Sequence, residues 1–363
     1  MSRENVYNFS AGPSIMPEQV LLRARSELCD YRQSGMSVME MSHRSSLFAD
    51  ILSQTKLKLA AALGVPEGYE ILFLQGGATL QFASIPMNLL SPGGVADYAV
   101  TGHFSRSAAK EAEKYGSVHI ACSSADRDHS YIPSQSALEL SQGADYFYYC
   151  ANNTIYGTEW QYLPETGGVP LVCDMSSDIL SRPVNVSDYG LIYAGAQKNM
   201  APAGLTVVII KKELAGRAMP QTPSVMDYKA LIEKDSMLNT PPCWCIYMLG
   251  LMLDWLSECG GVSAMESLRS ERASLVYDFL DNSRLFVPHA ERGSRSGMNV
   301  TFRTASAETD AEFVKSAAEA GLLNLKGHRL TGGMRASMYN AMPLEGAKAL
   351  VEHMKEFEVQ HHV

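Results

Sequence analysis

The stretch "YAGAQKNMAPAGLTVVIIKK", residues 193–212, places Lys198 in a turn rich in glycine and alanine between two apolar runs. These runs, "LIYAG" (191–195) and "LTVVII" (205–210), are continuous rather than alternating, which is typical of strands buried on both faces. Burying a lysine is costly unless its amine is paired, neutralised or used covalently. The stretch therefore predicts two central strands and a lysine that either reaches solvent or does chemistry.

Similar apolar runs recur earlier in the chain. They are "EILFL" (70–74), residues 96–100 of "VADYAV", "VHIAC" (118–122), "DYFYYC" (145–150) and "VPLVCD" (169–174). Helices are predicted over 17–34, from Pro17 to a cap at Gly35, and over 46–63, ending at Gly64. Because strand-like and helix-like segments alternate, we expect an α/β fold with a mainly parallel, seven-stranded sheet between helices.

The pattern changes near residue 260, after an apolar helix that includes "WCIYMLGL" (244–251). The later elements are predicted as a helix (262–282), the strand "MNVTFR" (298–303), a helix (308–320), the strand "GMRASMYN" (333–340) and a closing helix (344–358). We therefore expect a large domain of residues 16–259 and a smaller α+β domain made of residues 1–15 and 260–363.

Composition narrows the class of protein. The chain has 363 residues, of which 46% are hydrophobic, and a formal net charge of -9. This charge argues against binding to nucleic acid or to an anionic membrane, so small molecules and other copies of the chain are the expected partners. With neither a membrane-length apolar run nor a signal-peptide pattern, we expect a cytoplasmic protein. Its seven scattered cysteines lack the spaced pairs of a zinc site, so we expect reduced thiols and no metal.

Residues just after parallel strands are the first candidates for a binding site, because ligands of open α/β sheets bind beyond the carboxyl ends of strands. In "LFLQGGATLQF", Gly76, Gly77, Ala78 and Thr79 lie between a strand and a helix, where free backbone N–H groups can hold a phosphate. The alternative is a tight turn without a ligand. The pattern is neither the dinucleotide fingerprint nor a P-loop, which disfavours both of those classes.

Two further strand ends carry ionisable groups. Asp174 ends "VPLVCD", and Gln197 and Lys198 follow "LIYAG". Taken alone, Asp174 is a possible helix cap and Lys198 a possible surface residue. Together, a lysine nucleophile for a carbonyl cofactor, a carboxylate for a pyridine nitrogen and a phosphate cradle indicate pyridoxal 5'-phosphate.

The chain also resembles, from end to end, the phosphoserine aminotransferase family, which are class-V, fold-type-I pyridoxal-phosphate enzymes. The matching segments are "NFSAGPS" (8–14), "SVMEMSHRS" (37–45), "DMSSDILSRPV" (174–184), "YGLIYAGAQKNMAPAGLT" (189–206), "SMLNTPP" (236–242) and "LKGHRLTGGMRASMYNAMPLEG" (325–346). Their order and spacing make the resemblance specific. It implies a transaminase.

This resemblance implies a role for several residues that bind the cofactor. Lys198 is expected to form the Schiff base and Asp174 to contact the pyridine nitrogen, while Phe104 takes the place of a stacking aromatic ring that is often tryptophan. The other expected cofactor contacts are Thr154 near the phenolic oxygen, Ala78, Thr79 and Gln197 at the phosphate, and Asn239 and Thr240 from the neighbouring subunit of a homodimer.

The family resemblance also implies the substrate contacts. Arg335 matches the arginine that binds the α-carboxylate. The distal phosphate or γ-carboxylate is expected at His43, Arg44, His328 and Arg329. One departure is Thr79, where some relatives carry arginine, and Arg106 is a candidate to replace that cation.

The implied reaction is a ping-pong transamination in serine biosynthesis. L-Glutamate and 3-phosphooxypyruvate give O-phospho-L-serine and 2-oxoglutarate, and 4-phosphooxy-L-threonine, used in pyridoxine biosynthesis, is a possible further substrate. One alternative is a transaminase or lyase for another amino acid, because one fold hosts many reactions. The other is a binding protein that has kept the fold without catalysis, against which the presence of Lys198 and Asp174 argues.

Overall fold

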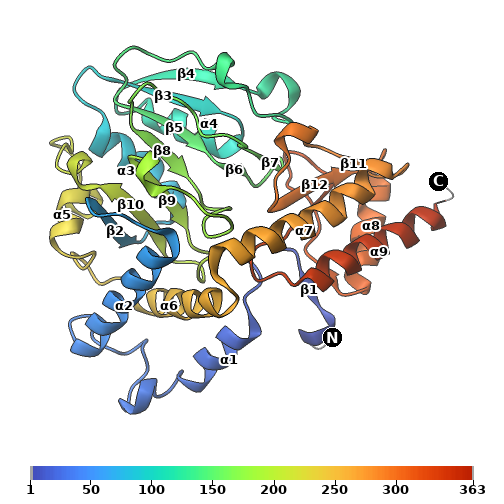
Figure 1. Ribbon diagram of the computed structural model, residues 1–363, viewed down its shortest axis with the longest axis horizontal. Coiled ribbons are helices and arrows are strands. Elements are labelled where there is room, and N and C mark those ends of the chain that lie inside the picture. The colour runs from blue at the N-terminus through green and yellow to red at the C-terminus, as the bar shows by residue number, and fades with distance from the viewer. Residues whose placement is uncertain (1–2, 362–363) are drawn as a thin grey trace.

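The computed structural model describes residues 3–361 and is built around a seven-stranded sheet (Figure 1). In spatial order its strands are β2 (Tyr69–Leu74), β10 (Thr206–Lys211), β9 (Leu191–Gly195), β8 (Leu171–Asp174), β5 (Tyr146–Cys150), β3 (Val95–Val100) and β4 (Ser117–Ser123). Strand β10 is antiparallel to both β2 and β9, and the remaining pairs are parallel. The predicted mainly parallel, seven-stranded α/β sheet is confirmed.

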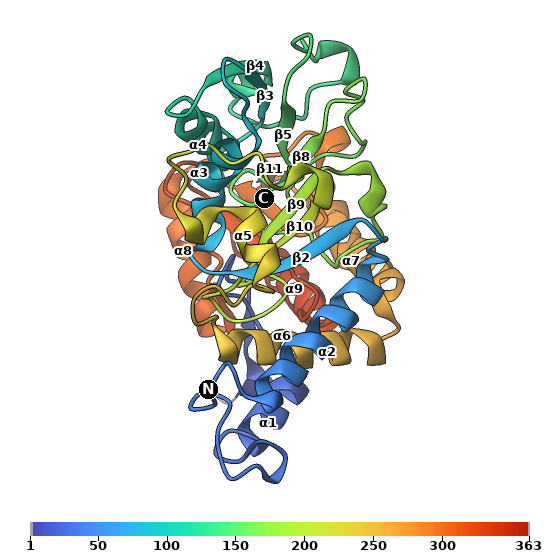
Figure 2. The ribbon, with the colours of Figure 1, turned by 90° about the vertical axis from the view of Figure 1, so that its left-hand side faces the viewer.

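Both faces of this sheet are covered by helices, as the two views show (Figures 1 and 2). One face packs against α1 (Glu18–Ser26), α2 (Ser46–Leu63) and α6 (Cys243–Glu258), and the other against α3 (Gly77–Leu89), α4 (His103–Ala112) and α5 (Tyr228–Glu233). Strand β10 divides its side chains between the two cores, with Val207 on one face and Val208 on the other. The continuous apolar run of this strand is explained by burial on both faces.

The observed bounds of the first two helices can be compared with those predicted from the sequence. Helix α2 matches its prediction: the Ser45 side chain accepts a hydrogen bond from the Phe48 N–H, and Gly64 ends the helix with a left-handed φ of 61°. Helix α1 is much shorter than the predicted 17–34. It ends at Ser26, and Pro17 is its N-cap rather than its first helical residue.

A turn built by an aspartate explains why the first helix stops early. The Asp30 carboxylate accepts a hydrogen bond from the Gly35 N–H at 2.8 Å, and Arg32 and Gln33 have left-handed φ values of 49° and 64°. Side chains of this type compete with the helix for backbone N–H groups. Gly35 therefore closes this turn and does not cap a helix.

The C-terminal third forms a second, smaller layer at the right of Figure 1. Its elements are α7 (Gly261–Asn282), β11 (Val287–Pro288), β12 (Asn299–Arg303), α8 (Ala307–Glu319), β13 (Leu322–Leu323), β14 (Met334–Ser337) and α9 (Leu344–Gln360). Strands β11, β12 and β14 form an antiparallel sheet, while β1 (Tyr7–Asn8) pairs with β13 in parallel. Phe9 enters the core of this layer, which supports our proposal that residues 1–15 and 260–363 form one domain beside 16–259.

Short elements complete the description. Strands β6 (Asn152–Asn153) and β7 (Thr158–Glu159) form a small antiparallel pair. The 3-10 helices are Arg3–Asn5, Tyr31–Gln33, Ala125–Arg127, Gln135–Ala137, Val186–Asp188, Lys212–Leu214, Ser224–Met226 and Arg292–Ser294.

A buried ion pair connects the small layer to the segment that follows β5. Glu159 of β7 is fully buried, and both of its carboxylate oxygens accept hydrogen bonds from the Arg269 guanidinium of α7. The Gly297 N–H also donates to this carboxylate at 2.9 Å. The Arg182 Nε lies 3.7 Å from the same carboxylate, so Glu159 has two cations, of which Arg269 makes the closer contact.

We expect Arg269→Met to lower the free energy of unfolding by about 1.5–3 kcal/mol, because the buried Glu159 carboxylate loses its hydrogen bonds from Arg269 and keeps only the Arg182 guanidinium, 3.7 Å away. Urea unfolding of parent and variant measures this loss. As a matched control, Lys355→Met removes the lysine of an exposed pair with Glu352 and should change stability little. Equal effects of the two substitutions would contradict the structural role of the Glu159–Arg269 pair.

Candidate active site

The candidate site begins where β8 and β9 end side by side. Asp174 is the last residue of β8 and lies in register with Tyr193 of β9, and Lys198 lies in the turn that follows β9. This turn is closed by backbone hydrogen bonds, including one from the Ala196 N–H to the Leu205 carbonyl at 3.0 Å. The parallel pairing of the two strands therefore brings Asp174 and Lys198 to the same edge of the sheet.

The Asp174 carboxylate, 5% exposed, is held by hydrogen bonds on both oxygens. Its Oδ1 accepts from the Ser176 N–H at 2.8 Å and from the Ser176 hydroxyl at 2.6 Å, and its Oδ2 accepts from the Tyr193 hydroxyl at 3.0 Å. Three donors of this kind favour the ionised carboxylate. Asp174 is thus a fixed negative charge in the site.

A second buried tyrosine, Tyr148, contacts Tyr193. The hydroxyls of Tyr193 and Tyr148 lie 2.8 Å apart, and burial raises the pKa of both well above the ordinary value. Both side chains therefore stay neutral and can donate hydrogen bonds. The sequence prediction did not include Tyr193 or Ser176, although the "DMSS" motif contains the serine two residues after the aspartate that often forms such turns.

The Lys198 amine faces Thr154 and Phe104, and the site that these residues form with Asp174 is called the crevice below. The Lys198 Nζ donates a hydrogen bond to the Thr154 hydroxyl at 2.7 Å and lies 5.5 Å from the centre of the Phe104 ring. Burial is the main cause that lowers the pKa of Lys198; the Asp174 charge opposes this shift and the Arg335 charge adds to it. The Lys198 residue is half-buried, its amine is turned toward Thr154, and this amine loses its proton more easily than that of a surface lysine.

The small layer reaches this crevice through Arg335 of β14. Its guanidinium donates a hydrogen bond to the Thr154 carbonyl at 3.3 Å, beside the residue that contacts Lys198. The structure thus brings together four of the predicted residues: Asp174, Thr154, Lys198 and Arg335. Phe104, the second residue of α4, closes the same group of side chains.

The N-terminal segment forms one wall of the site, which the sequence prediction did not assign. The Ser14 N–H donates to the Gln197 carbonyl at 3.1 Å, and the Tyr339 hydroxyl donates to the Ala11 carbonyl at 2.8 Å. Gly12 has a φ of 137°, and a Cβ there would lie 3.2 Å from Lys198 Cγ. Only glycine combines this backbone conformation with so close an approach to the lysine.

The expected phosphate cradle is partly assembled around a glycine. A Cβ added to Gly195 would lie 2.9 Å from the Gln197 Oε1 and 3.4 Å from the Ala78 Cβ, so these two side chains meet beside the end of β9. Helix α3 begins at Gly77, and its first turn includes Ala78 and the exposed Thr79. Its N–H groups are suited to an anion.

Arg106 contacts a histidine of its own chain. Its Nη2 lies 3.1 Å from the His129 Nε2, and burial and the Arg106 charge lower the pKa of His129 to about 4. The neutral imidazole accepts the hydrogen bond from the guanidinium. The structure therefore gives no support to Arg106 as a replacement for the cation that Thr79 lacks.

Several predicted residues lie apart from the Asp174–Lys198 pair. Asn239 and Thr240 are exposed, and the Asn239 amide donates to Gln75 of its own chain at 2.8 Å. His43 and Arg44 lie in the loop before α2, and neither side chain forms a hydrogen bond or ion pair within residues 3–361. A role for these four residues at a site of the neighbouring subunit stays a prediction.

His328 and Arg329 lie in the loop between β13 and β14. The His328 ring lies 6.4 Å from the ring of His103, the first residue of α4, while Arg329 is exposed. This loop thus approaches the site next to Phe104. His103 was not among the predicted site residues, although it directly precedes the expected stacking ring.

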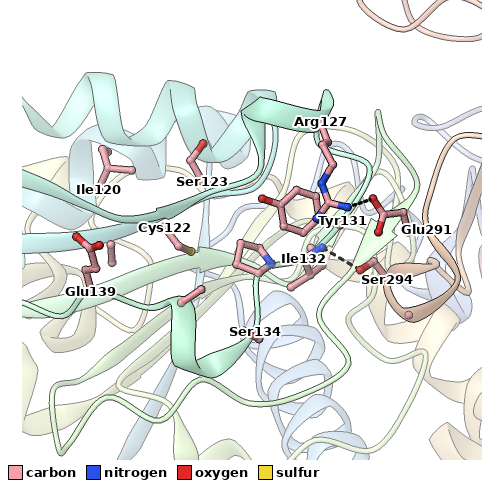
Figure 3. A pocket seen from close by; sticks show the side chains of 14 residues that line it. Ile120, Cys122, Ser123, Arg127, Tyr131, Ile132, Ser134, Glu139, Glu291 and Ser294 are labelled. Carbon is pink, nitrogen blue, oxygen red and sulfur yellow. Dashed lines mark hydrogen bonds and ion pairs between the residues drawn. The ribbon is translucent and has the colours of Figure 1, made fainter.

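A pocket of about 690 Å³ beside β4 is separate from this site. Figure 3 shows that two of its charged side chains pair with each other: the Arg127 guanidinium donates to Glu291 at 2.7 Å and lies 3.7 Å above the Tyr131 ring. None of the predicted site residues lines this pocket. The Asp174–Lys198 crevice is therefore the better candidate for chemistry.

Comparison with known proteins agrees with the geometry of the crevice. Residues 6–350 match the family model described as aminotransferase class-V. The chain is 50% identical over 358 residues to phosphoserine aminotransferase of Pseudomonas fluorescens (strain SBW25), with 99% of each chain covered. The chain belongs to the class-V aminotransferase family, among the phosphoserine aminotransferases.

Solved structures of class-V relatives agree with this assignment. The phosphoserine aminotransferase from Bacillus circulans subsp. alkalophilus superimposes with a TM-score of 0.97 at 44% identity, covering 99% of both chains. The pyridoxal-phosphate-bound phosphoserine aminotransferase from Trichomonas vaginalis gives 0.92 at 39% identity, covering 96% of this chain and 99% of that one. The fold of this class-V aminotransferase is thus that of fold type I.

We expect Tyr193→Phe to lower the free energy of unfolding by about 1.5–3 kcal/mol, because the Asp174 carboxylate loses a hydrogen bond to a charged group. Tyr148→Phe removes a bond between two neutral hydroxyls and should cost about 0.5–1.5 kcal/mol. Denaturant unfolding of both variants compares the two losses. A Tyr193→Phe loss no larger than that of Tyr148→Phe would mean that Asp174 carries no charge.

Proposed function

We propose that this protein transfers an amino group between L-glutamate and 3-phosphooxypyruvate, giving O-phospho-L-serine and 2-oxoglutarate. The observation that carries this proposal is the Lys198 amine, whose pKa burial lowers, at the same sheet edge as the fixed Asp174 carboxylate. The relatives named phosphoserine aminotransferases, about half identical over nearly the full chain, support the choice of substrates.

The residues of the crevice fit pyridoxal 5'-phosphate. When bound, this cofactor supplies a carbon that reacts with amines and a ring that withdraws electrons. Asp174 would hold the proton of the pyridine nitrogen, and Phe104 would offer a ring to pack against the pyridine. The phosphate is assigned to Ala78, Thr79 and Gln197, and the phenolic side to Thr154.

Lys198 is the proposed general base and acid. Its Nζ takes the proton from Cα of the bound amino acid and returns a proton to complete the transfer. Its lowered pKa means that the amine gives up its proton more readily than that of a surface lysine, as a base requires. The hydrogen bond to Thr154 fixes the position of the amine beside the crevice.

Substrate binding is assigned to cations on two sides of the crevice. Arg335 offers a planar guanidinium for the α-carboxylate, which it can bind through two parallel hydrogen bonds. His328 and Arg329 are assigned to the distal phosphate or γ-carboxylate. In the proposed homodimer, Asn239 and Thr240 contact the cofactor phosphate of the partner, and the unpaired side chains of His43 and Arg44 are available for its distal pocket.

Half-reactions of the purified protein distinguish the proposed transamination from related transaminase or lyase reactions. Each candidate amino acid is added to the cofactor-loaded protein, and the change in cofactor absorbance is followed. Phosphoserine and glutamate should both convert the cofactor, and 4-phosphooxy-L-threonine is tested in the same way as a possible second substrate. Conversion by other amino acids alone would favour a different transaminase or a lyase.

The cytoplasmic location is a proposal that rests on the seven cysteines, all of them free thiols. A separate finding is that no helix among residues 3–361 is long and apolar enough to cross a membrane.

We expect Lys198→Ala to abolish transamination, because no other described amine contacts Thr154 in the crevice. Steady-state assay with glutamate and 3-phosphooxypyruvate measures the loss. Lys212→Ala, which removes the lysine of an exposed pair with Glu70, is the control and should keep the parent rate. Repeated turnovers by Lys198→Ala at a substantial fraction of the parent rate would overturn its assignment.

We also expect Arg329→Ala to lower kcat/KM for phosphoserine more than for glutamate, because the phosphate carries more negative charge than the γ-carboxylate. A lost charge-assisted hydrogen bond corresponds to roughly ten- to a hundredfold, with phosphoserine near the upper end. Both half-reactions are measured at fixed ionic strength. Equal losses would mean that Arg329 shapes the site without recognising the phosphate.

A further inference from the structure

The imidazole of His103 lies at the edge of the crevice and has no role in the mechanism described above. Its ring centre is 5.5 Å from that of Phe104 and 6.4 Å from that of His328. The residue is partly exposed, and its ring nitrogens form no hydrogen bond or ion pair within the described chain, residues 3–361. Both nitrogens are thus available to a ligand in the crevice.

The opposite imidazole is oriented by its own loop. The Leu330 N–H donates a hydrogen bond to the His328 Nδ1 at 3.3 Å. A nitrogen that accepts in this way leaves the proton of a neutral imidazole on the other nitrogen, Nε2. His328 therefore has an N–H donor that its own backbone does not use.

The charged groups that act on the His328 imidazole are all of one sign. Burial, Arg335, His103 and Arg329 lower the pKa of His328, in that order, and no carboxylate is among these causes. The amine of Lys198, near the Phe104 ring, is a further basic group on this side of the crevice. A group of basic side chains of this kind attracts an anion.

We propose that His103 is a specificity-determining residue that, together with His328, holds the distal phosphate of the substrate. This inference rests on the proposed function and deepens it. Imidazoles 6.4 Å apart between ring centres can each donate to a different oxygen of one tetrahedral phosphate. A distal carboxylate has two oxygens in one plane and about half the charge, so it gains less from the second donor.

The pair also makes phosphate binding depend on pH. In the ligand-free site the lowered pKa keeps His328 largely uncharged at neutral pH. A phosphate dianion between the rings favours the protonated imidazole, so binding takes up protons and weakens as pH rises above 7. The phosphate itself contributes little to this change, because its second pKa is about 6.

The test uses the cofactor-loaded protein and two ligands that cannot react. 3-Phosphoglycerate has a carboxylate and a phosphate ester but no amine or keto group, and glutarate has two carboxylates. Calorimetry at pH 7.5, in two buffers that differ in heat of ionisation, gives affinity and proton uptake. We compare the parent with His103→Ala, with His103→Gln, which keeps a neutral N–H donor, and with His361→Gln as a histidine control at the end of α9.

His103→Ala should weaken 3-phosphoglycerate binding about tenfold, as for one lost hydrogen bond to a charged group, and leave glutarate binding nearly unchanged. His103→Gln should recover part of this affinity but take up fewer protons than the parent. His361→Gln should match the parent for both ligands. Melting temperature and cofactor absorbance identify any variant that is misfolded or has lost its cofactor.

The role of His103 is overturned if His103→Ala weakens both ligands equally or neither. If His103→Ala does not fold, unchanged affinity and proton uptake in His103→Gln overturn it. Failure of the proposed function is seen separately, because the parent protein would then leave its cofactor unconverted by phosphoserine while the two non-reacting ligands still report on His103.

Discussion

Asp174 has to hold a negative charge almost out of contact with water, and the surrounding structure meets this requirement with hydrogen bonds. Ser176 and Tyr193 supply three donors, and Tyr148 contacts Tyr193 from behind. Since Tyr193 belongs to β9, the strand that leads to Lys198, the same two strands position the carboxylate and the amine. The buried charge and the lysine are therefore parts of a single arrangement.

Much of this arrangement was predictable from local sequence. Continuous apolar runs marked every strand of the large sheet, and the central ones need no polar alternation because they are buried on both faces, whereas the edge strand β4 is partly exposed. The strand ends then located Asp174 and Lys198, since parallel strands deliver their carboxyl ends to one edge. Helix α1 was predicted too long because the Asp30 side chain forms a local turn that apolar periodicity does not report.

Contacts between segments far apart in the sequence could not be predicted from local sequence patterns. Tyr193 appeared only as a strand residue, and its hydrogen bond to Asp174 depends on the register of β8 with β9. His103 is identified as a site residue only by its proximity to His328, which lies more than two hundred residues later in the sequence. His43 and Arg44 show the opposite case: the family resemblance assigns them to the distal pocket, and within one chain they lie without polar partners.

The pairing of β1 with β13 joins Tyr7 to Leu322 and holds the N-terminal segment against the turn that bears Lys198. During translation, the N-terminal segment that lines the site is therefore synthesised well before β13, the strand with which it pairs. The Tyr7–Leu322 pairing cannot form before β13 has been synthesised, so shorter chains lack this contact between the N-terminal segment and the small layer. Assembly of the site thus follows near-completion of synthesis, as expected where essential contacts are remote in sequence.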